Sequence, residues 1–174
     1  MRKALLVLAI VCSVLAVWVS VAVAARSIRF TNGCTGYLKL AANAATVERA
    51  EVFLTKVVDY IDKNDLNIGN SSIFIERPTN DLQEWSKNLR TARNLLARLI
   101  DDPNTSQLTK DNTLMKIREV ILKESNDDNS VNVPDNIALY PWQAWFVMVT
   151  PFLWLLTVVF WVLYALYPKK EDQD

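Results

Sequence analysis

Hydrophobic positions divide the chain into three regions. Two uncharged apolar runs, residues 4–25 and 144–167, enclose a middle stretch in which apolar and charged positions recur at helical spacing. A helix of the first run would be about 33 Å long, and the second run is slightly longer, whereas a hydrocarbon core is about 30 Å thick. We therefore predict transmembrane helices over residues 4–25 and 142–167.

The first run also carries features of a cleaved signal sequence. Arg2 and Lys3 precede it, and Ala22-Val23-Ala24 forms a small-residue cleavage pattern. A cleaved signal has an apolar region of only about 7–15 residues, however, and this run is longer. An uncleaved anchor is the favoured interpretation, and cleavage after Ala24 is the open alternative.

Aromatic residues lie near the ends of the second run, where amphipathic rings prefer the headgroup layer; they are Trp142, Trp145, Tyr164 and Tyr167. Pro151 lies inside the run and is expected to kink it. Thr150 is placed to satisfy a backbone group that the proline frees.

Flanking charge predicts the orientation. Lys169 and Lys170 follow the second run, whereas no Lys or Arg lies between Glu124 and Trp142. The positive-inside rule then places both termini in the cytoplasm, with tails 1–3 and 168–174, although Arg26 and Arg29 are a mild counter-signal. The middle region is expected outside the cytoplasm, which in a bacterium means a periplasmic domain on the inner membrane.

Three helices are expected in the middle region. Apolar positions spaced by three to five residues predict one long amphipathic helix over residues 37–63, and whether the first apolar helix runs into it past Gly33 stays open. Residues 64–80 lack a regular pattern. Asp81 and Glu84 form a capping box that predicts a second helix ending near Asp101, and a third is expected over residues 106–123.

The fold class predicted from this pattern is all-α: two transmembrane helices flanking an extracytoplasmic three- or four-helix bundle. The helical domain spans residues 26–123. The polar, acidic stretch 124–141 is expected to be a flexible tether into the second span.

Composition removes several functional classes. Lys and Arg total 19 and so do Asp and Glu, so no strong field attracts nucleic acid. The chain has no histidine, which excludes Ser-His-Asp and Cys-His catalysis and the usual zinc sites. Cys12 lies within the first span and Cys34 beyond it, so they cannot pair with each other. Cys34 is either a buried structural thiol or the site of an intermolecular disulfide.

One segment resembles a calcium-binding loop. Asp65, Asn67 and Glu76 stand at positions one, three and twelve of such a loop, but Gly69 and Asn70 are in the reverse of the expected order. Pro78 also blocks the helix that should leave the loop. A capped helix end followed by a turn is the favoured interpretation.

The remaining charged clusters are interpreted as solvated helix faces. One cluster consists of carboxylates spaced three apart: Asp59, Asp62 and Asp65. The other consists of basic residues on the second middle helix, for which binding to anionic headgroups or to an acidic partner is the alternative; they are Lys87, Arg90, Arg93 and Arg98. Asn70 and Asn104 begin glycosylation sequons that matter only in a eukaryotic secretory host. We predict no catalytic, cofactor-binding or metal site, and no enzymatic activity.

Three stretches carry a resemblance: GCTGYLK from Gly33, TVE from Thr46 and DLQEW from Asp81. Over residues 33–100 the chain resembles small, uncharacterised bacterial membrane proteins with a GCxGYLKxAAxAxTVExA opening. The resemblance implies a bacterial envelope location and brings no assigned activity or functional residue. It also implies a turn between Asn64 and Ser72.

The leading functional hypothesis is a membrane-tethered helical interaction or sensing module. Because the expected cytoplasmic tails are short, it would act as an accessory or regulatory partner of another membrane protein or as a homo-oligomer. The alternative is a structural subunit of a membrane complex docked through the second span, with Pro151 on the docking surface.

Overall fold

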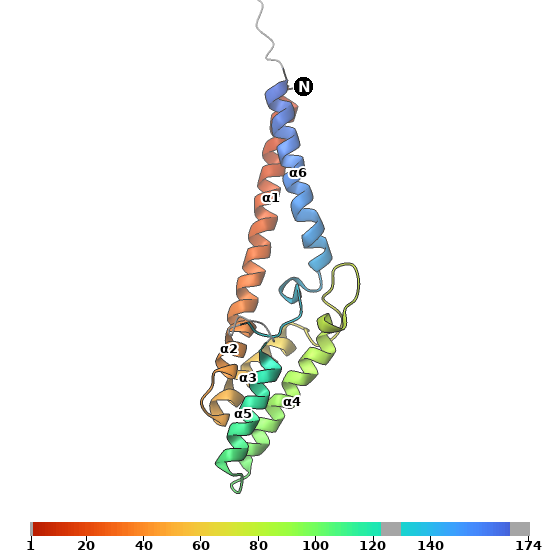
Figure 1. Cartoon of the computed structure of the whole chain (residues 1–174). Coiled ribbons are helices and arrows are strands. Elements are labelled where there is room, and N and C mark those ends of the chain that lie inside the picture. The colour runs from red at the N-terminus through yellow and green to blue at the C-terminus, as the bar shows by residue number, and fades with distance from the viewer. Residues whose placement is uncertain (1, 123–129, 168–174) are drawn as a thin grey trace, which may run out of the picture. The chain divides into compact units, whose positions relative to one another are not determined.

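The computed structural model describes residues 2–122 and 130–167, and this part of the chain is helical (Figure 1). No strand occurs among these residues, only isolated bridges between Asn70 and Asp81 and between Leu122 and Val131. The chain divides into two compact units, Ser27–Gln143 and the two flanking segments together. Two helices, Arg2–Ala42 and Gln143–Leu166, are long and apolar enough to cross a membrane.

The flanking unit pairs the first part of helix α1 (Arg2–Phe30) with helix α6 (Gln143–Leu166). The Arg2 guanidinium lies 5.0 Å from the ring centroid of Tyr164, and that of Arg26 lies 5.1 Å from the ring of Phe146. As the residue number rises along α1, the number of its partner on α6 falls. The two apolar helices are therefore antiparallel.

Small and hydroxyl side chains form the α1 side of this pairing. Ala9 and Ala16 are fully buried, and Ser13 and Ser20 accept hydrogen bonds of 3.2 Å from the indole Nε1 atoms of two tryptophans of α6, Trp161 and Trp154 respectively. Each of these three residue pairs is seven apart, the repeat that keeps one face of a helix against its partner. Small residues allow close backbone approach between apolar helices, and the paired serines satisfy the indole N–H groups.

Pro151 lies within α6, which is assigned as one helix across it. The Thr150 hydroxyl donates to the carbonyl of Phe146 at 2.7 Å. This differs from the sequence-based expectation, because the carbonyl that Pro151 leaves without its helical donor belongs to Val147, four residues before the proline. Thr150 therefore satisfies its own hydroxyl and does not replace the missing bond.

Filling the Ala16 position should separate the two helices. We expect Ala16→Leu to lower the free energy of unfolding of the full chain by about 1–3 kcal/mol, the usual cost of overpacking, and so to lower the midpoint of its SDS titration. Helix content followed by circular dichroism gives the midpoint. Val14→Leu, at an exposed position of the same helix, is the matched control. Equal midpoints for the two variants would contradict the pairing.

The helix that begins as α1 continues into the central unit. It passes through a π-helical turn, Thr31–Thr35, directly into α2 (Gly36–Ala42). The question left open at Gly33 is thereby answered: the glycine does not break the helix. A Cβ atom there would collide with the ring of Tyr60, so Gly33 permits close packing of α3 on this turn.

The prediction of a single long helix over residues 37–63 is wrong. Helix α2 ends at Ala42, Asn43 is its C-cap, and α3 (Val47–Lys63) starts anew with the Thr46 hydroxyl accepting from the backbone N–H of Arg49. Both helices bury their apolar faces in the same core. The hydrophobic spacing therefore runs through the break, and the turn is encoded only by polar Asn43 and the capping threonine.

The later helices follow the expectation closely. After a short 3-10 turn, Pro78–Asn80, the Asp81 carboxylate caps α4 (Leu82–Asp101) by accepting from the backbone N–H groups of Gln83 and Glu84. Ser106 caps α5 (Gln107–Ile121) in the same way. Helices α2 to α5 pack on one another around a single apolar core, whose largest fully buried side chains include Leu38, Leu54, Ile61, Leu82 and Leu96.

The expected tether packs against this core where it is described. Residues 123–129 and the predicted tail 168–174, with Lys169 and Lys170, lie outside the described residues. In residues 130–141, a 3-10 turn, Ile137–Leu139, buries Ile137 and Leu139. The Trp85 indole N–H donates to the carbonyl of Asn132 at 3.0 Å. Apolar positions spaced among polar ones thus make this segment part of the domain and not a separate linker.

Candidate functional site

The calcium-like segment is a turn. Asp65 follows the end of α3 with a φ of 53°, and Leu66 donates its backbone N–H back to the carbonyl of Ile61. The Asn70 side chain accepts from the N–H of Ser72 at 2.9 Å and donates to the carbonyl of Arg77 at 3.0 Å. Its amide thus shapes the loop itself, and its side-chain oxygen is engaged within the loop.

The charged clusters lie at the surface. Asp62 forms an ion pair with Arg90, which joins α3 to α4, and Asp59 and Asp62 are exposed on α3. Asp65 lies beyond the end of α3 and so does not share their helical face, contrary to the three-residue spacing. Along α4, Arg93 donates to the side chain of Asn94. A polar hollow of about 520 Å³ beside Asp62 and Arg90 is wide and open.

Cys34 is fully buried in the core, and neither it nor Cys12 forms a disulfide. A thiol with no exposed surface cannot meet a second chain without opening the helices around it. Its burial among apolar side chains supports the structural interpretation of this residue.

Outside the apolar runs 4–25 and 144–167, three titratable groups in the described part of the chain have shifted pKa values, and each shift has a structural cause. Burial raises the pKa of the Cys34 thiol to about 12. Hydrogen bonds with its own backbone N–H and with the Thr46 hydroxyl lower the pKa of Glu48, as expected for an acid in the first turn of α3. Burial raises the pKa of Tyr60, Cys34 adds to the effect and Arg29 opposes it. Tyr60 is the ring that packs on Gly33.

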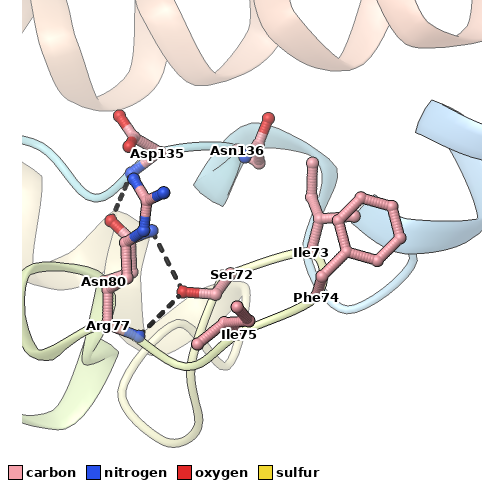
Figure 2. A pocket seen from close by; sticks show the side chains of 8 residues that line it. All are labelled: Ser72, Ile73, Phe74, Ile75, Arg77, Asn80, Asp135 and Asn136. Carbon is pink, nitrogen blue, oxygen red and sulfur yellow. Dashed lines mark hydrogen bonds between the residues drawn. The ribbon is translucent and has the colours of Figure 1, made fainter.

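The most developed local structure outside the helices is the loop of residues 70–80, and Asn80 holds it together. Asn80 is buried, its side-chain NH2 donates to the Ser72 hydroxyl at 3.1 Å, and its side-chain oxygen accepts from the backbone N–H of Asp135 at 3.1 Å. The Ser72 hydroxyl also accepts from the N–H of Arg77. Figure 2 shows these bonds as dashed lines. One buried amide thus joins the base of the loop to the segment before the second apolar helix.

Two further contacts fix this loop to the same segment. Gly69 has a φ of 97°, which favours glycine, and a Cβ atom there would collide with the Tyr140 hydroxyl. The Gln143 side-chain NH2 donates to the carbonyls of Asn70 and Ser72, both at 3.3 Å. The loop is therefore tied to Tyr140 and Gln143 as well as to Asp135.

The tip of the loop is apolar and exposed. Ile73 is half-buried, whereas Phe74 and Ile75 are 76% and 78% exposed, the two highest values among large hydrophobic residues in the described part of the chain. A hollow of about 250 Å³ lies beneath the tip, lined also by Arg77 and Asp135. In Figure 2 the side chains of Ile73 and Phe74 lie on the side of the loop away from Asn80 and Asp135. The loop has a polar, bonded base and an apolar tip.

The apolar triplet Ile73-Phe74-Ile75 stands out in the sequence against the polar residues around it, but this contrast alone assigns it no role. The partners Asn80, Asp135 and Gln143 carried no sequence signal, because they are 8 to 73 residues from the groups they bond.

Comparison with known proteins adds no relative from which a role could be carried over. No protein-family model matches the chain, and neither the curated proteins nor the solved structures gave a significant match.

Removing the Asn80 amide should loosen both segments that it joins. We expect Asn80→Ala to destabilise the domain by about 1–3 kcal/mol, because the Asp135 N–H would be left without its partner. In hydrogen exchange of the full chain, residues 70–80 and 130–141 should lose protection together. The neighbouring exposed variant Thr79→Ala should change neither segment, and a loss confined to residues 70–80 would contradict the proposed connection.

Proposed function

We propose that this chain is a membrane-anchored interaction protein. In this proposal, two antiparallel apolar helices cross a bacterial inner membrane and hold an extracytoplasmic helical bundle. The bundle binds another membrane protein as an accessory or regulatory partner. The observation that carries the proposal is the paired helix seam, in which Ser13 and Ser20 meet tryptophans of α6.

Antiparallel pairing supports the two-span topology. Because Arg26 and Phe146 meet at one end of the pair, the chain leaves α1 and re-enters α6 at that same end. A polypeptide anchored in this way has the whole segment Ser27–Gln143 on one face of the bilayer. The pairing also favours an uncleaved first helix, since cleavage after Ala24 would remove the partner of Trp154 and Trp161.

The outer face of α5 is the surface that best suits a protein partner. The helix packs inward through Ile117 and Ile121, which are buried. Leu108 and Met115 are exposed, and their spacing of seven places them on one face. Exposed apolar side chains aligned on a helix are the anchors by which a helix binds a groove or a second helix.

Labelling in intact bacteria tests the topology. With Cys12 replaced by serine, a membrane-impermeant maleimide should label Asn88→Cys, an exposed position of α4, in intact cells. It should label Lys3→Cys only after the inner membrane is opened. The chain carrying Cys12→Ser alone is the blank. Labelling in the reverse order would place the domain in the cytoplasm and contradict the proposal.

Site-specific photocrosslinking in native membranes tests the interaction. A benzoylphenylalanine at Leu108 or Met115 should give one discrete adduct with a membrane protein identified by mass spectrometry. The same probe at Lys87, an exposed position of α4, should give no adduct. The adduct formed from Met115 should be lost when Leu108 is changed to Lys. An adduct formed only from Phe152, on α6, would instead favour a structural subunit docked through the second span, and adducts from no position would contradict both.

A further inference from the structure

The loop tip presents apolar surface that its own fold does not cover. Phe74 and Ile75 are more exposed than any other large hydrophobic residue in the described part of the chain, and the hydrogen bonds of Ser72, Asn80 and Arg77 fix the loop below them. An exposed apolar patch held in place by a polar base marks an interaction site more often than a packing failure. The question is which surface it meets.

Chain connectivity restricts the answer. Gln143 bonds the carbonyl of Ser72, so Phe74 is only two residues, or about 7 Å of chain, from a group in contact with Gln143. Gln143 is followed directly by the uncharged run that begins at Ala144. The headgroup layer is roughly 5–7 Å thick on each side of the hydrocarbon core. If α6 crosses the bilayer, the tip therefore lies within reach of that layer.

Neighbouring residues have the composition of a membrane interface. Trp142, one residue before Gln143, is 58% exposed, and indole rings favour the headgroup level. Arg77 is exposed on the same loop and lines the hollow below the tip together with Asp135. A zwitterionic or anionic headgroup could meet these charges, while the apolar side chains would enter the upper acyl region.

We propose that the Ile73-Phe74-Ile75 tip inserts into the outer interfacial layer of the same bilayer that α6 crosses. It forms a third membrane contact beside the two spans. This inference rests on the proposed two-span anchoring. The apolar tip contacts lipid. Because the hydrogen bonds of Asn80 already hold the base of the loop, the apolar side chains stay exposed, and insertion does not require further ordering of the loop.

Spin-label accessibility in liposomes tests the insertion. The full chain, with Cys12 replaced by serine and reconstituted into phosphatidylethanolamine–phosphatidylglycerol vesicles, is labelled at Phe74→Cys. The ratio of collisions with oxygen, which partitions into lipid, to collisions with a water-soluble nickel chelate reports the depth. Cys34 is fully buried, and the chain carrying Cys12→Ser alone measures any background from it.

Two matched positions make the result decisive. Leu108 is 70% exposed on α5, so a label at Leu108→Cys should give the low oxygen-to-nickel ratio of a water-exposed site. Val158 is exposed on α6, so a label at Val158→Cys should give the high ratio of a lipid-exposed site. We expect the oxygen-to-nickel ratio at position 74 to rise well above that at 108 and towards that at 158. A ratio at 74 equal to that at 108 overturns the insertion, and protection from both reagents at 74 overturns it in favour of a protein cover. A water-like ratio at 158 would instead show that the anchoring itself fails.

Discussion

The antiparallel seam between α1 and α6 is the interaction on which the rest of this account depends. If the two helices cross a bilayer as proposed, they have no hydrophobic reason to associate in lipid, so specific contacts have to hold them. Here buried Ala9 and Ala16 allow close approach, and two serines bond two indoles. The seam brings the two attachment points of the central domain to one end of the pair, and in the proposed topology this places the whole domain on one side of the bilayer.

A small number of polar contacts also completes the fold of the central domain. Its helices share one apolar core, but the segment leading to α6 is held by Trp85, Asn80 and Gln143, each bonding a backbone group far away in sequence. These bonds tie the base of the apolar loop to Gln143, the residue that precedes the uncharged run in the chain. The same contacts that complete the fold thus set the position of the surface that we assign to lipid.

Much of the secondary structure was predictable from local chemistry. The apolar runs define the two flanking helices, and the Asp81 and Ser106 caps define the starts of α4 and α5, because each signal lies within a few residues of its effect. The break between α2 and α3 was missed, since both helices face one core and the apolar spacing crosses the turn without interruption. The sequence predicts a flexible tether over residues 124–141 because polar residues dominate that stretch. In its described part, residues 130–141, a few apolar side chains, Ile137 and Leu139 among them, decide the packing.

The candidate site was predictable only in part for the same reason. The exposed triplet is visible in the sequence, but its base depends on partners up to 73 residues apart. Likewise the role of Gly33 is to admit the Tyr60 ring, a contact that spacing cannot reveal. Predicting the seam would have required knowing that α1 and α6 are neighbours, although the seven-residue spacings of its alanines, serines and tryptophans are present in the sequence.

The pairing of the two apolar helices can be measured directly in a bilayer. Spin labels at Lys3→Cys and Leu166→Cys, in the full chain with Cys12 replaced by serine, would be placed in liposomes and diluted with unlabelled chain. Pulsed dipolar spectroscopy then gives the distance between them. A single narrow distribution at short distance is predicted, because Arg2 and Tyr164 meet at this end of the pair. A broad or long distribution would mean that the helices are not paired and would contradict the account at its base.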